Sequence, residues 1–295
     1  MKYTYYPGCS LRGTARAYEE SLLAVFQALG VELEMLEDWN CCGATAYMSV
    51  DQLQAFALAA RNLALAERLP GDLITPCSGC YLVLNKCQRY MREYPGIKRV
   101  VHGALTAAGL AYGDRVKVRH PLDVLAHDVG AEAIARRVVR PLTGLRVAPY
   151  YGCQIVRPYA TFDDQHHPQA MDRLLAATGA TVVDFSLKTR CCGGTQKGTL
   201  PEVGLHLVHT LLHEARARQA DVISVVCSLC QFNLEAFQDQ IARELEPIHI
   251  PVLYFTQILG LAFGLPPKQL GLQRSLVPVE PCLAERGLAR ATSTV

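Results

Sequence analysis

The residues best suited to chemistry in this sequence are its cysteines, and their spacing occurs twice. Two adjacent cysteines followed by glycine stand at residues 41–43 and again at residues 191–193. In both halves a Cys-x-x-Cys motif begins 35 residues after the second cysteine of the pair, and a lone cysteine precedes the pair by 32 or 38 residues. The cysteines of this pattern are Cys9, Cys41, Cys42, Cys77 and Cys80 in the first half and Cys153, Cys191, Cys192, Cys227 and Cys230 in the second. Ten of the twelve cysteines follow one repeated pattern, which favours metal or redox chemistry.

The redox state of these cysteines is inferred from the N-terminus. The segment "MKYTYYPGCS" has no charged region leading into a long apolar core, so no secretory signal is visible. We therefore expect a cytoplasmic protein, with membrane association only through partners. Disulfide frameworks are disfavoured in that reducing compartment, and twelve cysteines are too many to be inert small hydrophobes.

Five thiols in each half exceed what the common metal sites require. A structural zinc ion takes four ligands, and a cubane 4Fe-4S cluster also takes four cysteines. Consecutive side chains in an extended segment point to opposite sides, so adjacent cysteines reach two different irons more easily than one ion. A multi-iron cluster is therefore favoured. Zinc with a spare thiol, and a vicinal disulfide or buried thiol pair, remain the alternatives.

The glycine after each cysteine pair also fits a cluster site. Gly43 and Gly193 would allow the backbone to come close to a bound cofactor and to turn with a positive φ angle. We therefore count both glycines among the cofactor-binding residues.

The surroundings of the cysteines repeat as well, and they alternate β-rich runs with amphipathic helices. The segment "YTYYPGC" matches "VAPYYGC", and "DQLQAFALAARNLALAERL" is typical of a helix. A repeat of roughly 150 residues indicates duplicated domains rather than a solenoid. Strands separated by helices predict parallel α/β layers with the functional loops at the strand ends. Both Cys-x-x-Cys motifs open a predicted helix, where free backbone N–H groups favour thiolate over thiol.

We expect an α/β fold with two pseudo-symmetric domains, each with a small, mainly parallel sheet flanked by helices. The first domain is placed at residues 1–101 and the second at residues 145–265. Residues 102–144 carry none of the cysteine pattern and are taken as a connector. Residues 266–295 form a tail rich in proline and glycine, which we expect to be frayed.

Charge and hydropathy exclude two classes of partner. The 29 lysines and arginines nearly balance the 27 aspartates and glutamates, and no basic run is present, so nucleic acid is not expected as a partner. The longest apolar run, at residues 250–265, is interrupted by proline and glycine and falls short of the ~20 residues that a membrane span requires.

The complete cysteine pattern resembles the duplicated CCG domain of the heterodisulfide reductase B subunit, and the likeness runs from "YYPGCSLRG" to "PVLYFTQILGLAFGL". The resemblance implies two noncubane 4Fe-4S clusters that face the site of disulfide cleavage. Carried over residue by residue, the ligands of one cluster would be Cys9, Cys41, Cys42, Cys77 and Cys80, and those of the other Cys153, Cys191, Cys192, Cys227 and Cys230. No ligand of the family pattern is missing in either half.

The implied function is that of one subunit of an oxidoreductase that acts on sulfur groups. Two clusters flanking one S–S bond would supply the two electrons that its reduction takes, and in reverse the site would form a disulfide or persulfide. The chain has neither a dinucleotide-binding motif nor a ferredoxin-type cysteine run. The resemblance therefore implies three partners: the ferredoxin-type iron–sulfur C subunit, the flavin-containing A subunit and, as a candidate substrate carrier, a lipoate-bearing protein. The alternative is an electron-relay subunit of a flavin-dependent dehydrogenase, passing electrons toward quinone.

Several further cysteines and histidines fall outside the pattern. Cys87 and Cys282 are taken as ordinary thiols, and the histidines as surface residues without a site role, although helical spacing would place three of them on one face. These histidines are His166 and His167, which precede a predicted helix, and His206, His209 and His213 within another.

Overall fold

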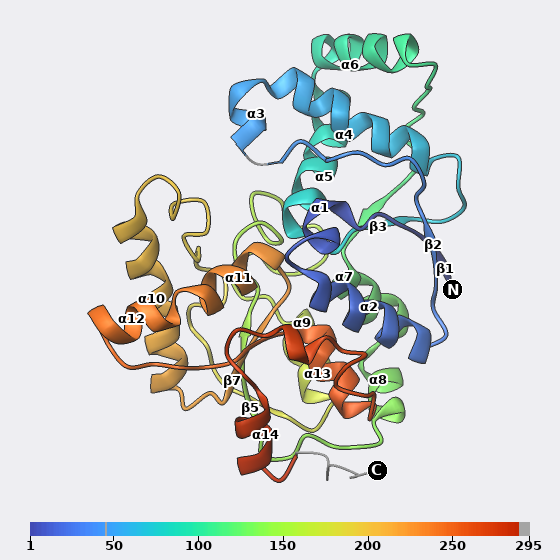
Figure 1. Cartoon of the computed structure of the whole chain (residues 1–295). Helices are drawn as coiled ribbons and strands as arrows, with labels where there is room; N and C mark the ends of the chain where they lie inside the picture. Colours follow the sequence, from blue (N-terminus) through green and yellow to red (C-terminus); the bar gives the residue numbers. More distant parts are fainter. Residues whose placement is uncertain (45, 289–295) are drawn as a thin grey trace.

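The computed structural model describes residues 1–44 and 46–288 and shows two four-stranded sheets, one in each half of the chain (Figure 1). The strand order is β2-β1-β3-β4 in the first sheet and β6-β5-β7-β8 in the second, and all neighbouring strands are parallel. The strands are β1 (Lys2–Tyr5), β2 (Glu32–Met35), β3 (Leu73–Ile74), β4 (Val118–Arg119), β5 (Arg146–Tyr150), β6 (Thr181–Val182), β7 (Val222–Val225) and β8 (Val252–Tyr254). The predicted fold class, two small parallel sheets flanked by helices, is confirmed.

Helices connect the strands and cover the sheets. Those of the first half are α1 (Gly8–Arg12), α2 (Arg16–Ala28), α3 (Ala46–Val50), α4 (Gln52–Ala66), α5 (Ser78–Glu93), α6 (Pro95–Ala107), α7 (Pro121–Val124), the π-helix η1 (Leu125–Val129) and α8 (Ala131–Arg137). Those of the second half are α9 (Ala170–Ala176), α10 (Pro201–Ala217), α11 (Ser228–Ala236), α12 (Gln238–Glu244), α13 (Phe255–Ala262), the 3-10 helix η2 (Leu272–Arg274) and α14 (Glu280–Glu285).

Local sequence explains where these elements begin. The central strands consist almost entirely of buried residues, as a parallel sheet covered on both faces requires. Asp51 caps α4 by accepting a hydrogen bond from the backbone N–H of Gln54 at 3.0 Å. Proline occupies the first turn of α6 and of α10, where its missing N–H costs no helical hydrogen bond.

The two inner strands of each sheet create the place where the cysteines gather. In a parallel sheet of this order, the connections from the two inner strands leave in opposite directions and open a crevice at their carboxyl ends. Cys9 follows β1 and Cys77 follows β3, and Cys153 and Cys227 follow β5 and β7 in the same way. The fold therefore delivers a lone cysteine and a Cys-x-x-Cys motif to one crevice in each half.

The two halves pack by exchanging helical contacts. Helix α2 of the first half lies beside α13 of the second (Figure 1), and the hydroxyls of Ser21 and Thr256 are 2.7 Å apart in this contact. In the pseudo-equivalent contact, α9 of the second half packs against α7 and η1. The halves are thus joined through a buried interface rather than through a single linker.

The segment predicted as a connector takes part in this arrangement. Strand β4 lies within residues 102–144 and forms the edge of the first sheet, with Leu73 and Ile74 as its partners. Its place matches that of β8 in the second sheet. These contacts associate residues 118–129 with the first repeat, and the division of the chain at residues 101 and 145 stays a prediction.

The end of the chain is better ordered than its composition indicates. Leu270, Leu272, Val279 and Leu283 are buried in the common core. The expectation of a frayed tail is therefore wrong for residues 266–288, because apolar side chains spaced between the prolines and glycines anchor the segment. Residues 289–295, which belong to the same prediction, lie outside the described residues.

As for membrane association, the described part of the chain contains no helix whose length and apolar character would let it cross a bilayer.

Candidate metal centre

Each half brings its five predicted cysteines together around one crevice, and all twelve cysteines of the chain are free thiols. In the first half, hydrogen bonds connect the thiols of Cys41, Cys42, Cys80 and Cys77 in that order, and Cys9 lies near Cys41. In the second half, Cys153 pairs with Cys191 and Cys227 with Cys230, and Cys230 Sγ lies 3.5 Å from Cys192 Sγ. The structure thus contains two separate sets of five thiols, which we call the first and second thiol sets.

The thiols of the first set divide into donors and acceptors of hydrogen bonds. A hydrogen bond from Cys41 lowers the pKa of Cys42 to about 4 and raises the pKa of Cys41. A hydrogen bond from Cys80 likewise lowers the pKa of Cys77 to about 6. Cys42 and Cys77 are therefore thiolates at neutral pH, which is the form that binds soft metals.

The second set divides in the same way. A hydrogen bond from Cys153 lowers the pKa of Cys191 to about 6, and one from Cys230 lowers the pKa of Cys192. The pKa values of the two donors, Cys153 and Cys230, are raised. Each set therefore carries two stabilised thiolates before any metal is considered.

Backbone N–H groups assist these thiolates. The N–H of Gly193 donates to Cys191 Sγ at 3.3 Å, and that of Ala44 donates to Cys42 Sγ at 3.5 Å. Cys77 and Cys227 are the N-caps of α5 and α11, so each lies at the positive end of a helix dipole. The predicted helix openings at both Cys-x-x-Cys motifs are confirmed.

A second pair of glycines, which was not predicted from the sequence, approaches the sulfurs more closely than those of the CCG motifs. A methyl group on Gly8 would lie 2.9 Å from Cys80 Sγ, and one on Gly152 would lie 3.0 Å from Cys230 Sγ. Both glycines have positive φ angles, of +71° and +72°. The matched segments "YTYYPGC" and "VAPYYGC" carried this signal, since the glycine directly precedes the lone cysteine in both.

Gly43 and Gly193 have a different role from the one the sequence indicated. A methyl group on Gly43 would lie 3.1 Å from the Cα and the carbonyl oxygen of Ala55 in α4, and one on Gly193 would lie 3.1 Å from the Cα of Gly204 in α10. Their positive φ angles, +78° and +73°, agree with the expectation of a turn. The close approach at these positions is to a helix, which seats the cysteine pair on the domain.

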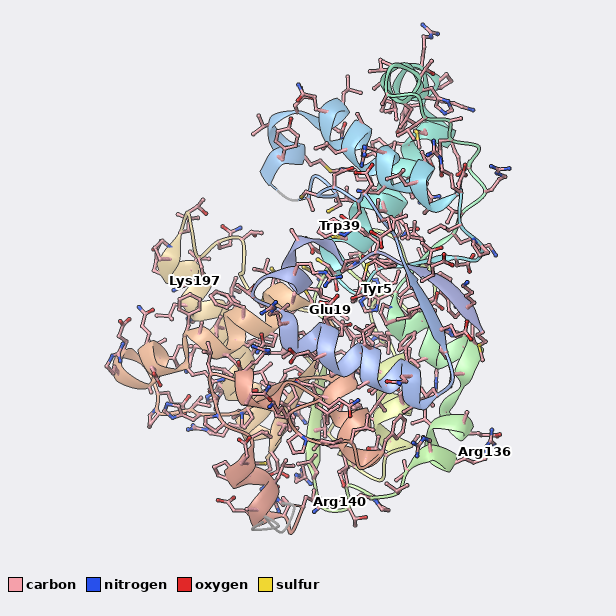
Figure 2. The ribbon with its side chains drawn as sticks, turned by 45° about the vertical axis from the view of Figure 1, so that its right-hand side comes forward. Tyr5, Glu19, Trp39, Arg136, Arg140 and Lys197 are labelled. Atoms are coloured by element: carbon pink, nitrogen blue, oxygen red, sulfur yellow. The ribbon has the colours of Figure 1, made fainter. Side chains whose placement is uncertain are left out.

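A tyrosine in each half fixes the segment leading to the cysteine pair. The Tyr6 hydroxyl donates to the carbonyl of Asn40 at 2.9 Å, and the Tyr150 hydroxyl donates to the carbonyl of Arg190 at 2.6 Å. Both carbonyls belong to the residue before the pair. The ring of Trp39 packs edge-on against Tyr6 at 5.6 Å, and Figure 2 shows Trp39 close to the centre of the molecule, with Tyr5 and Glu19 nearby.

The two thiol sets face each other across the interface between the halves. Ser228 Oγ lies 3.9 Å from Cys77 Sγ, and Ser78 Oγ donates to the Val226 carbonyl at 3.4 Å. On the same interface a methyl group on Gly79 would lie 3.3 Å from the side-chain oxygen of Gln154. The Cys-x-x-Cys loop of each half therefore contacts residues that flank the cysteines of the other.

A stacked tyrosine pair lies beside this contact. The rings of Tyr18 and Tyr254 are parallel within 9° and 4.2 Å apart, and both side chains are fully buried. Cys77 of the first set and Cys227 of the second are among the charged neighbours of both hydroxyls. The Tyr18 hydroxyl has no hydrogen-bond partner within the described residues. An unpaired buried donor beside thiolates fits a site built for a sulfur-rich group.

The spacing of the thiols also bears on which metal group they fit. A single zinc ion holds its ligands about 2.3 Å away, so the sulfurs around it lie roughly 4 Å apart. Among the described residues, the only three such side chains whose ligand atoms all lie within 4.8 Å of one another are two histidines and a glutamate, none of them from the thiol sets. The thiols are thus spread more widely than one ion requires, which favours a group with several irons.

The remaining predicted residues do not join the thiol sets. Cys87 is buried in α5 and its thiol donates to the Phe56 carbonyl at 3.4 Å, whereas Cys282 lies on α14 near Asp221. The backbone N–H groups of His166 and His167 both donate to the Asp164 carboxylate in an exposed turn before α9. His206, His209 and His213 lie on α10, outside both thiol sets.

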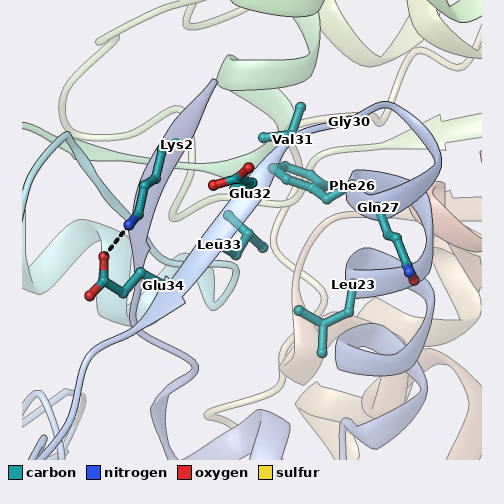
Figure 3. A pocket seen from close by; sticks show the side chains of 9 residues that line it. All are labelled: Lys2, Leu23, Phe26, Gln27, Gly30, Val31, Glu32, Leu33 and Glu34. Atoms are coloured by element: carbon teal, nitrogen blue, oxygen red, sulfur yellow. Dashed lines mark ion pairs between the residues drawn. The ribbon is translucent and has the colours of Figure 1, made fainter.

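A hollow of about 530 Å³ lies on the outside of the first half, between α2 and the edge strand β2 (Figure 3). Its walls include Phe26 and Leu33, and Lys2 forms an ion pair with Glu34 at 2.9 Å at its rim. None of the cysteines lines it. This hollow is separate from the candidate metal centre.

Two buried titratable groups near the cysteine loops have pKa values shifted in opposite directions. His120 begins α7, and burial lowers its pKa to about 4. Its Nδ1 accepts from the N–H of Leu122 at 3.1 Å, so Nε2 carries the proton and donates to the Pro76 carbonyl at 2.9 Å. Glu235 of α11 has one carboxyl oxygen without a partner within the described residues, and burial raises its pKa to about 7.

Substitutions at these two positions should reveal opposite pH dependences of stability. Neutral His120 stabilises the fold fully above its unfolded pKa and loses that contribution as the pH falls toward 4. Protonated Glu235 stabilises fully below its unfolded pKa and loses its contribution as the pH rises through about 7. Between roughly pH 5 and 6.5 we expect Glu235→Gln to gain stability with rising pH and His120→Gln to lose it, by up to about 1 kcal/mol per pH unit.

Urea unfolding under nitrogen, followed by circular dichroism, measures both slopes. The wild-type chain should show a shallow profile in this window because the two contributions oppose each other. Parallel profiles in the two variants would contradict the assignment.

Comparison with known proteins agrees with this arrangement. The family model described as "Cysteine-rich domain" matches residues 3–85 and 147–235, which include both thiol sets. The chain is 33% identical over 278 residues to a protein of Archaeoglobus profundus named as like the heterodisulfide reductase B subunit, covering 92% of this chain and 93% of that protein. It is 30% identical over 283 residues to the B subunit of the ferredoxin/F(420)H(2)-dependent CoB-CoM heterodisulfide reductase of Methanosarcina acetivorans, covering 94% of each.

Another relative has a different name. The chain is 32% identical over 281 residues to the 8-methylmenaquinol:fumarate reductase membrane anchor subunit of Wolinella succinogenes, covering 94% of this chain and 97% of that protein. Among solved structures, a hypothetical protein from Helicobacter pylori matches with a TM-score of 0.75 at 14% identity, over 94% of this chain and 52% of that one. This structural likeness shows the fold alone.

The two matches to the domain model and the identity over nearly the whole chain lead to one conclusion. The chain belongs to the CCG cysteine-rich domain family, carries the domain twice, and is an iron–sulfur protein of the same type as the heterodisulfide reductase B subunit.

Proposed function

We propose that this chain is the catalytic iron–sulfur subunit of a heterodisulfide reductase-like complex, which cleaves a disulfide or persulfide reductively or, in reverse, forms it. The observation that carries the proposal is the meeting of two complete five-thiol sets across one interface, where Ser228 Oγ lies 3.9 Å from Cys77 Sγ. Reducing a disulfide to two thiols takes two electrons and two protons, and each set would hold a cofactor that transfers one electron at a time.

The cofactors we propose are two noncubane 4Fe-4S clusters. Their ligands would be the first thiol set (Cys9, Cys41, Cys42, Cys77 and Cys80) and the second (Cys153, Cys191, Cys192, Cys227 and Cys230). Four of these ten thiols have lowered pKa values, so part of the anionic charge that iron requires is already stabilised by the protein.

The residues around the sets would control the surroundings of the cofactors. The N–H groups of Ala44 and Gly193 donate to sulfurs, which stabilises electron-rich sulfur. The stacked rings of Tyr18 and Tyr254 exclude water from one side of the contact between the sets. The Tyr18 hydroxyl is positioned to donate a hydrogen bond to a sulfur there.

The partners we propose are the ferredoxin-type iron–sulfur C subunit and the flavin-containing A subunit of such a complex, with a lipoate-bearing protein as a candidate carrier of the substrate. The support is that the relatives are themselves named as parts of multisubunit reductases, including a D subunit from Methanosarcina acetivorans. Membrane association would come through such partners, and the cytoplasm remains the predicted location.

A second candidate function is supported by the relative in Wolinella succinogenes, which is named for a quinol:fumarate reductase. In this alternative the chain is an electron-relay subunit of a flavin-dependent dehydrogenase that passes electrons toward quinone. The same pair of clusters would then serve as a conduit, and no disulfide would bind between them.

Iron and inorganic sulfide content tests the cofactors directly. Anaerobically purified chain should contain about eight of each, from two four-iron clusters. Stoichiometric zinc without sulfide would contradict both redox functions.

Electron paramagnetic resonance separates the two functions. If the chain is catalytic, adding disulfides or thiols to the oxidised protein should change the cluster spectra. Spectra that ignore a panel of disulfides, lipoamide included, but respond to a menaquinone analogue would favour the relay.

A further inference from the structure

Three side chains of the second half come together outside the thiol sets. His209 and His213 lie one turn apart on α10 and point to Glu246, which follows α12. Glu246 Oε2 lies 3.0 Å from His209 Nε2 and 2.8 Å from His213 Nδ1. The three ligand atoms all lie within 4.8 Å of one another. We propose that His209, His213 and Glu246 form a binding site for one transition-metal dication of the zinc class.

The donor atoms select the class of ion. Two imidazole nitrogens and one carboxylate oxygen suit zinc and its first-row neighbours, whereas magnesium and calcium prefer oxygen alone. Zinc binds such nitrogens at about 2.0 to 2.1 Å, so small side-chain rotations would bring the three atoms onto one ion. Three protein ligands leave a fourth tetrahedral position to water.

The surroundings of the three residues keep the ligands in a metal-binding form. Burial lowers the pKa of His209, and the neighbouring His213 and Arg216 add to this effect, so its imidazole is neutral and has a free lone pair. Arg216 forms an ion pair with the other carboxylate oxygen, Oε1, and leaves Oε2 facing the two histidines. A hydrogen-bonded carboxylate of this kind is typical of the groups that orient metal ligands.

The position of the site on α10 connects it to the second thiol set. The first turn of α10 supports the CCG loop, since Gly204 lies against Gly193, and the histidine pair follows on the same helix. Glu246 comes from the segment after α12, which packs beside α10 (Figure 1). A bound ion would therefore tie that segment to the helix that seats the second cysteine pair.

Zinc retention by the cluster-loaded chain tests the proposal. The protein is prepared anaerobically with its iron counted, incubated with Zn²⁺, desalted and analysed for both metals. We expect the wild-type chain to retain about one zinc ion more than the His209→Ala/His213→Ala variant. His206→Ala is the matched control, because His206 is exposed on the same helix but is not one of the three ligands. It should retain zinc like the wild type.

A conservative variant guards against effects on folding. Glu246→Gln preserves size and should lower zinc affinity about ten-fold or more while iron content stays unchanged. Zinc should also raise the unfolding temperature of the wild type and of His206→Ala, and leave that of the double variant unchanged.

Two results would overturn the site. Equal zinc in the wild type and the double variant would place the ion elsewhere, on thiols. No zinc above the double variant, at any concentration up to about a hundred times that of the protein, would show that the three residues form an ion-pair network only.

Discussion

Replacing Cys80 by alanine should lower the iron content of the chain from about eight to about four atoms, with sulfide falling in parallel. Cys80 is hydrogen-bonded to Cys42 and Cys77, so its loss removes the central thiol of the first set. The second set consists of different residues on different loops and should keep its iron. Iron and sulfide analysis of anaerobically purified variants measures the change.

Cys87→Ala is the control for this prediction. Cys87 lies two turns after Cys80 on α5 and is also buried, but its thiol contacts the carbonyl of Phe56 rather than another cysteine. It should retain about eight irons at a modest cost in stability. Equal losses of iron in the two variants would mean that the helix, and not the ligand, determines iron content. An unchanged content in Cys80→Ala would remove Cys80 from the ligand set.

Replacing Gly8 by alanine should have an effect nearly as large. The added methyl group would lie 2.9 Å from Cys80 Sγ, closer than carbon and sulfur pack. A thiol that ligates iron cannot move away freely, so either the ligand or the turn must give. We expect the loss of about half the iron, together with destabilisation well beyond the ~1 to 2 kcal/mol of the left-handed backbone itself. Gly152→Ala should do the same to the second set through Cys230.

Gly30→Ala isolates the contribution of the backbone. Gly30 has nearly the same φ angle as Gly8, +69° against +71°, but a methyl group there would meet nothing within 4 Å. It should lose about 1 to 2 kcal/mol of stability and no iron. If Gly8→Ala behaves like Gly30→Ala in both measurements, the approach of backbone to sulfur has no role in holding the cluster.

The duplication produces two sites that are similar but not identical. Each half builds its own thiol set from the same four loops, with a tyrosine and two glycines in matching positions. The interface is less symmetric than the halves, since His120 begins α7 where Tyr254 begins α13. The Tyr254 ring stacks on Tyr18, whereas the His120 ring packs edge-on against Tyr81. The two thiol sets are thus alike in ligands and different in surroundings, which would give two bound clusters different potentials.

The cysteines and their division into two repeats can be read from the sequence alone, because thiols that recur at one spacing in a reducing compartment are typical of metal and redox sites. Alternation of strands and helices also predicts parallel sheets, since each crossover between parallel strands needs a helix. From these two facts it follows that cysteines after the strands gather at the sheet ends.

Long-range packing decided the rest. Strand β4 has only two residues, and nothing in its local pattern distinguishes it from a connector until β3 pairs with it. Gly8 resembles any turn glycine until Cys80, 72 positions away, approaches it. Glu246 and the histidines of α10 meet only because α12 folds back beside that helix. Close approaches between distant segments leave no periodic trace in the chain, so only the tertiary structure shows which thiols, glycines and histidines come together.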